Sequence, residues 1–160
     1  MIDFKGHRFE HETYIKIKDQ WKYLYRAVDQ EGQTIDFLLT AHRDQKAALR
    51  FLKKATRQHG LPDKITIDKS GANTAAIEAL KEETGHAIEI RQNKYLNNLV
   101  EQDHRAVKRI VRPMLGFQSF RSAQVTLQGI ELMHMIRKGQ MITVDGQGLS
   151  PAEQFYSLAA

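Results

Sequence analysis

Residues 97–109 read Asn-Asn-Leu-Val-Glu-Gln-Asp-His-Arg-Ala-Val-Lys-Arg and combine acids, a histidine and cations at helical spacing. Positions three, four and seven apart share one face of a helix, and the polar residues at this spacing are Glu101, His104, Arg105 and Lys108. A separate apolar stripe is formed by Val100, Val107 and Val111. The segment therefore predicts a helix that packs inward along its valines and presents a face of mixed charge.

This polar face also has a purely structural explanation. Asn98 would cap the helix, Glu101 would be the capping-box partner at the third helical position, and the cations would be solvated. In the other explanation the acid binds a metal ion and the cations face a phosphate backbone. The rest of the chain has to decide between the two.

The N-terminal part of the chain predicts three strands joined by short turns. Residues 12–18, 21–29 and 34–40 are rich in β-branched and aromatic residues, and turn-forming residues lie between them. Such an order is typical of an antiparallel meander. Residues 1–10 are expected to lead into the meander without forming an element of their own.

After the meander the hydrophobic period becomes helical. Asp44 is a predicted N-cap, and apolar residues follow at helical spacing until Gly60. We further predict a strand at 64–67, a helix at 72–83, a strand at 87–91, the helix that begins near Asn98, a break at 112–116 and a helix at 122–138. The apolar side of that last helix is expected to carry Val125, Leu132, Met133 and Ile136. Residues 149–155 resemble a helix start with proline at the first position.

This order of elements predicts an α/β fold. The strands after the meander need crossover helices, so they can pair in parallel with the first strand and complete a mixed five-stranded sheet flanked by helices. At 160 residues the chain has the length of one domain.

Composition narrows the function classes. The chain has no cysteine, which excludes thiol catalysis and zinc-thiolate sites. Lys and Arg number 24 against 19 Asp and Glu, and this net charge of +5 favours polyanionic partners. No segment predicts a membrane span or a secretory signal, so we expect a cytoplasmic protein that acts away from membranes.

Two acidic residues lie near the carboxyl ends of predicted strands, where α/β proteins usually bind their ligands. Asp68 ends the predicted strand at 64–67, and Glu101 opens the helix after the next strand. Two-metal phosphodiester chemistry needs carboxylates from separate elements to hold two cations about 3.5–4 Å apart. The first strand offers Glu10, His11 and Glu12 as a third group.

Several segments together resemble a known family. They are His11-Glu12-Thr13-Tyr14-Ile15-Lys16, residues 21–29, Thr34-Ile35-Asp36, Asp68-Lys69, and the run Lys94-Tyr95-Leu96-Asn97-Asn98 followed by Glu101-Gln102-Asp103-His104. These segments are similar to the integrase-type core of bacterial insertion-sequence transposases, and most closely to the IS-six family of short single-gene elements. The resemblance implies a ribonuclease H-like fold with an Asp, Asp, Glu metal triad. It also implies an integrase-like core over residues 1–140, with residues 141–160 as a C-terminal extension.

Carried over residue by residue, the resemblance assigns the second acid to Asp68 and the third to Glu101. His11 stands where the family has its first catalytic aspartate. The resemblance implies a cofactor of two Mg²⁺ or Mn²⁺ ions, and neutral imidazole would weaken such a site because it removes a charge and a second oxygen. Glu12 points to the opposite face of a strand. His11, Asp68, Glu101 and His104 could instead hold one manganese or zinc ion.

The resemblance also implies DNA, both transposon ends and target, as the partner. Lys108 matches a basic residue that the family places two turns beyond its glutamate, and Lys69, Arg105, Arg109 and Arg112 are further candidates for phosphate contacts. Family members usually carry an N-terminal helix-turn-helix region for end recognition, which we expect this chain to lack. We expect a homodimer or higher oligomer associated with a bacterial nucleoid.

Two functions follow from these residues. The first is a catalytic core for DNA strand cleavage and strand transfer, impaired by His11. The second is a non-catalytic remnant that binds DNA or oligomerises through its basic residues. Aromatic residues of the meander, such as Tyr14, Trp21 and Tyr25, either stack on bases or, more commonly for such positions, pack in the sheet.

Overall fold

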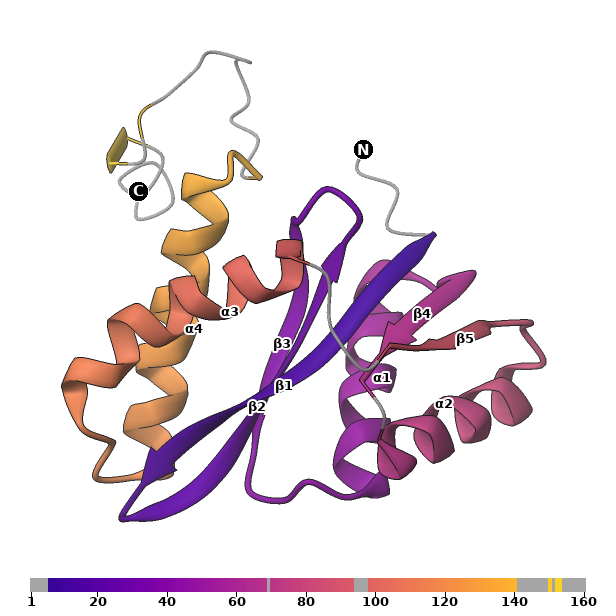
Figure 1. Cartoon of the computed structure of the whole chain (residues 1–160), viewed down its shortest axis with the longest axis horizontal. Helices are drawn as coiled ribbons and strands as arrows, with labels where there is room; N and C mark the ends of the chain where they lie inside the picture. Colours follow the sequence, from indigo (N-terminus) through magenta and orange to yellow (C-terminus); the bar gives the residue numbers. More distant parts are fainter. Residues whose placement is uncertain (1–5, 69, 94–97, 141–149, 151, 154–160) are drawn as a thin grey trace.

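The computed structural model describes residues 6–68, 70–93, 98–140, 150 and 152–153, and for residues 98–101 it describes the backbone only (Figure 1). The strands are β1 (His7–Ile17), β2 (Gln20–Asp29), β3 (Thr34–Thr40), β4 (Lys64–Ile67) and β5 (Glu89–Gln92). The helices are α1 (Gln45–His59), α2 (Gly71–Thr84), α3 (Asn98–Val111), the short 3₁₀ helix η1 (Arg112–Met114) and α4 (Phe120–Arg137).

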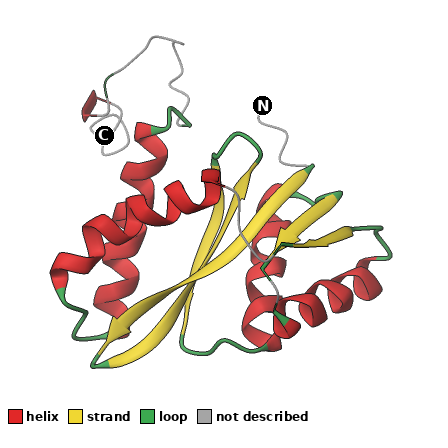
Figure 2. Cartoon of the chain, viewed as in Figure 1, coloured by secondary structure: helices red, strands yellow, loops and turns green. Residues whose placement is uncertain are grey.

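The five strands form one mixed sheet in the order β3-β2-β1-β4-β5. β1, β2 and β3 pair antiparallel, whereas β4 pairs in parallel with both β1 and β5. Figure 2 shows α1 and α2 on one side of the sheet and α3 and α4 on the other. The predicted meander and the predicted mixed five-stranded sheet are therefore confirmed.

Each face of the sheet packs its own core. Phe51 and Leu52 of α1 and Ile77 of α2 pack with Ile65 and Ile67 of β4 on one face. On the other face, apolar residues of β1, β2, β3, α3 and α4 form a second cluster, which includes Ile15, Leu24, Leu39, Val107 and Leu127. Because strand residues alternate between faces, β2 and β3 contribute to both cores.

The first helix begins and ends as predicted. The Asp44 carboxylate accepts a hydrogen bond from the Ala47 amide at 2.9 Å, which makes it the N-cap. Gly60 ends the helix with a φ of 83°, a conformation that favours glycine. Local sequence alone specifies both ends of α1.

The expectation for residues 1–10 is wrong where the structure describes them, because His7 to Glu10 belong to β1. This part of β1 pairs in parallel with β4 from His7 opposite Lys64 to Glu10 opposite Ile67. Charged Arg8 and Glu10 are buried here, and their polarity hides the strand pattern in the sequence. The last strand is also displaced, since it begins at Glu89 and not at residue 87.

The predicted apolar side of the last helix is partly wrong. Val125 is 59% exposed, and Leu132 and Met133 are only half-buried, whereas Ile136 is buried as expected. The buried face consists of Ala123, Leu127, Ile130, Glu131 and Ile136. Glu131 can lie on this buried face because Arg26 of β2 neutralises its charge. A prediction from hydrophobicity alone therefore assigns the wrong face of α4 to the core. Residues 152–153 are helical, and the remainder of the predicted terminal helix lies outside the described residues.

Burial of Glu10 generates the first testable prediction. Burial raises the pKa of its carboxyl group to about 7, so the folded chain retains a proton that the unfolded chain releases near pH 4.5. The free energy of unfolding should therefore fall by up to about 3 kcal/mol as the pH rises from 4.5 to 7, with respect to a Glu10→Gln variant. Urea denaturation of both proteins at pH 5 and pH 8 measures this difference. Parallel pH dependences would contradict it, and Glu82→Gln, at an exposed position, is the control.

Candidate functional site

Parallel pairing of β1 with β4 leads toward two of the predicted site positions. The β1–β4 register ends with Glu10 opposite Ile67, and His11 and Asp68 are the residues that directly follow this last pair. Asp68 is half-buried and directly follows β4, at the carboxyl end of an internal strand. The first and second positions of the predicted triad therefore lie on neighbouring segments of the chain, one residue beyond the end of the pairing.

A contact between two histidine rings brings α3 to the same place. The centroid of the His104 ring lies 3.7 Å from that of His11, and the rings are inclined at 81°. Glu101 precedes His104 by one helical turn, so its backbone lies on the same side of α3. The Glu101 side chain lies outside the described part of the structure. The Asn98 cap also stays a prediction, because α3 begins at Asn98 and that side chain is likewise undescribed.

His11 is a buried, neutral histidine. It is 2% exposed, and burial together with His104 and the charge of Arg26 holds its pKa well below the usual value. Burial, Arg26 and Lys108 lower the pKa of His104 to about 4. Within the described residues, both ring nitrogens of His11 and Nε2 of His104 have no hydrogen-bond partner. Two uncharged imidazoles therefore meet at position 11, where the sequence resemblance predicts the first carboxylate of the triad.

These donors do not fit a two-magnesium site. Mg²⁺ prefers hard oxygen ligands in octahedral geometry, and position 11 supplies imidazole nitrogen. Among the side chains that the structure describes, no three His, Asp or Glu residues are arranged to hold a metal ion. The described side chains therefore do not form a site in which His11, Asp68 and His104 would bind a single manganese or zinc ion.

Glu12 does not replace the missing acid, as the strand alternation predicts. Its carboxylate lies on the α1–α2 side of the sheet, where it accepts hydrogen bonds from Arg43 Nε at 2.6 Å and from Asn73 Nδ2 at 3.2 Å. Asn73 belongs to α2, across the sheet from α3. Both contacts hold Glu12 away from His11.

A buried ion network lies beside His11. Arg26 of β2 is opposite His11 in the β1–β2 register and is fully buried. Its guanidinium donates to both carboxylate oxygens of Glu131 on α4, from Nε at 2.5 Å and from Nη2 at 3.0 Å. Nη1 donates to Asp103 of α3. One side chain of the sheet therefore binds both helices of this face.

Asp103 extends the network to the end of α4. Its second carboxylate oxygen lies 2.8 Å from His134 Nε2 and accepts a hydrogen bond from Lys138. Burial opposes the charged form of Asp103, but the His134 hydrogen bond and the charges of Arg26 and Lys138 hold its pKa well below the ordinary value. Lys138 also donates to Thr34 Oγ1 of β3 at 2.9 Å.

Sequence reasoning missed this network. The available indication was charge at apolar positions: Arg26 interrupts the run Tyr-Leu-Tyr-Arg-Ala-Val, and Glu131 interrupts an apolar helix. Such residues indicate buried ion pairs, but the sequence does not name the partners.

The predicted DNA-contacting cations are exposed where they are described. Arg105, Lys108 and Arg109 of α3 and Arg112 of η1 line a shallow depression with Pro113. Lys69 lies outside the described residues. Tyr25 is buried and stacks on Phe51, with ring centroids 5.7 Å apart, whereas Tyr14 and Trp21 are exposed.

The ion network predicts a large effect of Arg26→Met on stability. This change leaves Asp103 and Glu131 buried without their common counter-ion, so unfolding should become easier by about 3–5 kcal/mol. Chemical denaturation at pH 7 measures the loss. Arg91→Met is the matched control, because Arg91 pairs with Glu89 on the surface and should give no measurable change.

Adding Glu131→Met to Arg26→Met should recover much of the loss, because Asp103 keeps His134 and Lys138. An Arg26→Met variant as stable as the wild-type chain would show that the network does not hold the helices.

Comparison with known proteins identifies the family. A family model described as a DDE domain matches residues 8–140. The transposases of insertion sequence-like element IS431mec and of IS257 in transposon Tn4003, both from Staphylococcus aureus, are each 38% identical to the chain over 154 residues. The alignments cover 93% of this chain and 66% of the relatives, so the chain spans slightly less than two thirds of their length.

Among solved structures, the HTLV-2 integrase catalytic core in complex with magnesium (trimeric form) matches with a TM-score of 0.60 and 14% identity, covering 93% of this chain and 95% of that one. The catalytic core of BIV integrase matches with a TM-score of 0.59 and 16% identity, covering 96% and 95%. At these identities the likeness concerns the fold, which is the ribonuclease H-like fold of integrase cores. No described helix is long and apolar enough to cross a membrane. With the DDE-domain match over most of its length, the chain belongs to the DDE-domain family of insertion-sequence transposases, in the IS-six group.

Proposed function

We propose that this chain is a transposase catalytic core for metal-dependent DNA strand cleavage and strand transfer, with Asp68 and Glu101 as two of its metal-binding acids. His11 replaces the first acid and impairs the reaction. The observation that carries the proposal is the register of β1 with β4, because its continuation by one residue would bring position 11 opposite Asp68, while the contact of His11 with His104 brings α3 to position 11. Residues 1–140 would form this core and residues 141–160 an extension.

Position 11 borders a charged network. Burial, His104, Arg26 and Lys138 disfavour a proton on His11, whereas Asp103 favours one. Arg26 and Lys138 are already paired with Asp103 and Glu131, so an acid at position 11 would share cations that have other partners. We infer that the fold around the first triad position is retained although the acid is not.

The proposed substrate is DNA, from transposon ends and from the target. Arg105, Lys108, Arg109 and Arg112 would contact phosphates, and Lys69 would do so beside Asp68. The relatives are transposases, and the HTLV-2 integrase core with magnesium has a dimeric and a trimeric form, which supports a divalent metal and a homo-oligomer as further proposals. In a bacterial cell such a protein would act at the nucleoid.

Restoring the acid at position 11 tests the proposal. His11→Asp should increase Mn²⁺ affinity at least about tenfold, because a carboxylate supplies the charge and the oxygen that imidazole lacks. Isothermal titration with Mn²⁺ measures the affinity, and nicking of supercoiled plasmid in Mn²⁺ or Mg²⁺ measures the reaction.

Two variants control this experiment. His11→Asn fills a similar volume without charge and should not bind metal more tightly. His11→Asp combined with Asp68→Asn should lose the gained affinity. If His11→Asp remains folded but neither binds Mn²⁺ better nor nicks DNA, also when joined to an end-binding domain, the catalytic proposal fails. The second function, a non-catalytic remnant that binds DNA, is then the better explanation. A buried, neutral His11 in place of an acid is consistent with it.

The DNA contact predicts a salt-dependent affinity. Lys108→Ala should weaken duplex binding about equally for all sequences and reduce the slope of log affinity against log salt by about 0.9. Fluorescence anisotropy of a labelled duplex at several salt concentrations measures both effects. Lys53→Ala on α1, across the sheet from α3, is the matched control. An affinity that does not fall with added salt would exclude phosphate contacts.

A further inference from the structure

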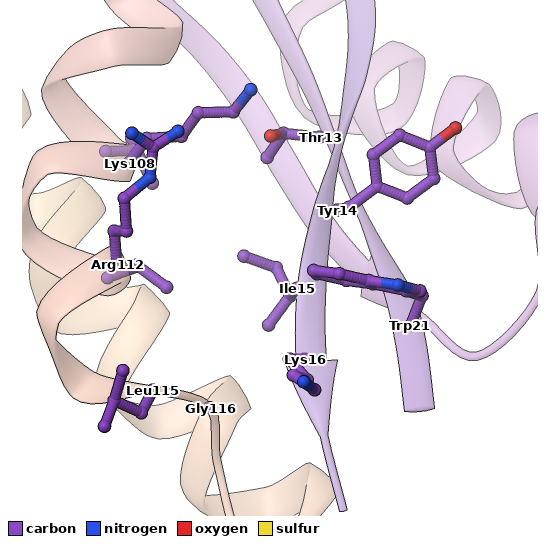
Figure 3. Close-up of a pocket in the computed structure, with 11 residues that line it drawn as sticks. Thr13, Tyr14, Ile15, Lys16, Trp21, Lys108, Arg112, Leu115 and Gly116 are labelled. Carbon is purple, nitrogen blue, oxygen red and sulfur yellow. The ribbon is translucent and has the colours of Figure 1, made fainter. Parts of the chain in front are cut away.

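A groove of about 370 Å³ lies between β1 and the segment formed by α3 and η1 (Figure 3). We call it the strand-edge groove, and six of its lining residues matter here: Ile15, Trp21, Val107, Lys108, Arg112 and Leu115. It exists because β1 pairs with β4 only from His7 to Glu10, so the following residues of β1 have no strand on that edge. The loop after η1 closes its far end, since Phe117 N donates to Lys16 O at 2.8 Å.

The groove combines an apolar floor, an exposed aromatic ring and cations. Ile15 and Val107 form the floor and are buried, whereas Trp21 is 58% exposed. In Figure 3, Lys108, Arg112 and Ile15 lie on the helix side of β1, whereas Tyr14 and Trp21 lie on the other side of this strand, so the groove follows the edge of β1 from one face to the other. None of the described residues that line the groove is acidic.

We propose that the strand-edge groove binds an unpaired stretch of a DNA strand, with its phosphates on Lys108 and Arg112 and one base stacked on Trp21. This inference rests on the proposed function, because it adds a strand-binding subsite to the same DNA-processing core. The chemistry is that of single-strand binding in general, in which a basic track holds the backbone and aromatic rings stack on bases without reading sequence.

The position of the groove favours DNA over a second copy of the chain as its occupant. His11 and His104 mark the proposed site, and the next residues on the same faces, Thr13 and Lys108, already line the groove. A strand whose reacting phosphate lies at the site can therefore continue into the groove. The three lining cations, Lys16, Lys108 and Arg112, would oppose a second copy of a basic chain but attract a polyanion.

The surroundings of Trp21 favour an unpaired strand over a duplex. The ring stands on the rim of the groove, with the Tyr14 ring 6.0 Å away at 72° and Lys16 Nζ 5.8 Å from its centroid. Bases within a duplex are already stacked on each other, so only an unpaired base can offer its face to this ring. A bound base would displace the flexible Lys16 ammonium, which could then contact a neighbouring phosphate.

Trp21 is the only tryptophan of the sequence, so its fluorescence reports on this groove alone. The full chain is titrated in EDTA with a 16-nucleotide oligothymidylate and, separately, with a blunt 16-base-pair duplex. We expect saturable quenching by the single strand and much weaker quenching by the duplex at equal occupancy. Anisotropy of labelled oligonucleotides supplies the occupancy independently of tryptophan.

Variants separate stacking from charge. Trp21→Ala should weaken single-strand binding about tenfold, while Trp21→Phe keeps a stacking ring and should bind within about threefold of the wild-type chain. Lys108→Ala and Arg112→Ala should each lower the salt slope for the single strand by about 0.7. Phe120→Ala is the matched control, because Phe120 is an exposed aromatic residue outside the groove.

Two results would overturn the inference while leaving the DNA-binding core intact. One is tight single-strand binding without quenching and without loss in Trp21→Ala. The other is quenching that rises with protein concentration in the absence of DNA, together with a dimer in sedimentation, which would assign the groove to a second copy. Failure to bind either form of DNA would instead overturn the proposed function itself, and the groove proposal with it. None of these measurements depends on catalysis at His11.

Discussion

Arg26 lies on β2 with its guanidinium fully buried, where Glu131 of α4 and Asp103 of α3 accept its hydrogen bonds. A buried cation is unfavourable unless its hydrogen bonds and its charge are satisfied, so both helices must approach the sheet at one position along their lengths. Apolar contacts such as those of Val107 and Leu127 would allow each helix to shift along the sheet. The ion network does not, because Asp103 must reach Arg26, His134 and Lys138 at once.

The same network sets the surroundings of the proposed site. Asp103 and His104 are consecutive residues of α3, so the helical turn that binds Arg26 also positions the His104 ring in contact with the His11 ring. The Arg26 charge that holds α3 in place also disfavours a proton on His11. Structural stability and the electrostatics of the site therefore have a common origin. An aspartate at position 11 would have to share Arg26 with Asp103 and Glu131.

β1 contributes both to the proposed site and to the strand-edge groove, because its two edges and its two faces have different neighbours. One edge pairs with β2 from Arg8 to Ile17, and the other pairs with β4 only as far as Glu10. Asp68 directly follows the end of β4, and the edge of β1 beyond this point becomes the strand-edge groove. The face toward α3 carries His11, Thr13 and Ile15, whereas Glu12 on the other face is held by Arg43 and Asn73. The alternation of apolar and polar residues describes such a strand poorly, which explains why its first five residues, 7–11, escape prediction.

The sequence by itself determined the α/β class, the meander, the limits of α1 and the candidate positions His11, Asp68 and Glu101, because caps, turns and hydrophobic periods are local properties and the motif residues resemble a known family. Only the tertiary structure decided that Arg26 and Glu131 are a buried pair, that Val125 is exposed, and that His11 meets His104. These outcomes depend on residues that are distant in the sequence. For Arg26, the partners Asp103 and Glu131 lie 77 and 105 positions away. A charged residue at an apolar position indicates that a partner of opposite charge exists. Many acids of the chain have the required chemistry, but few can reach a buried arginine. The packing of the helices on the sheet therefore selects the partner.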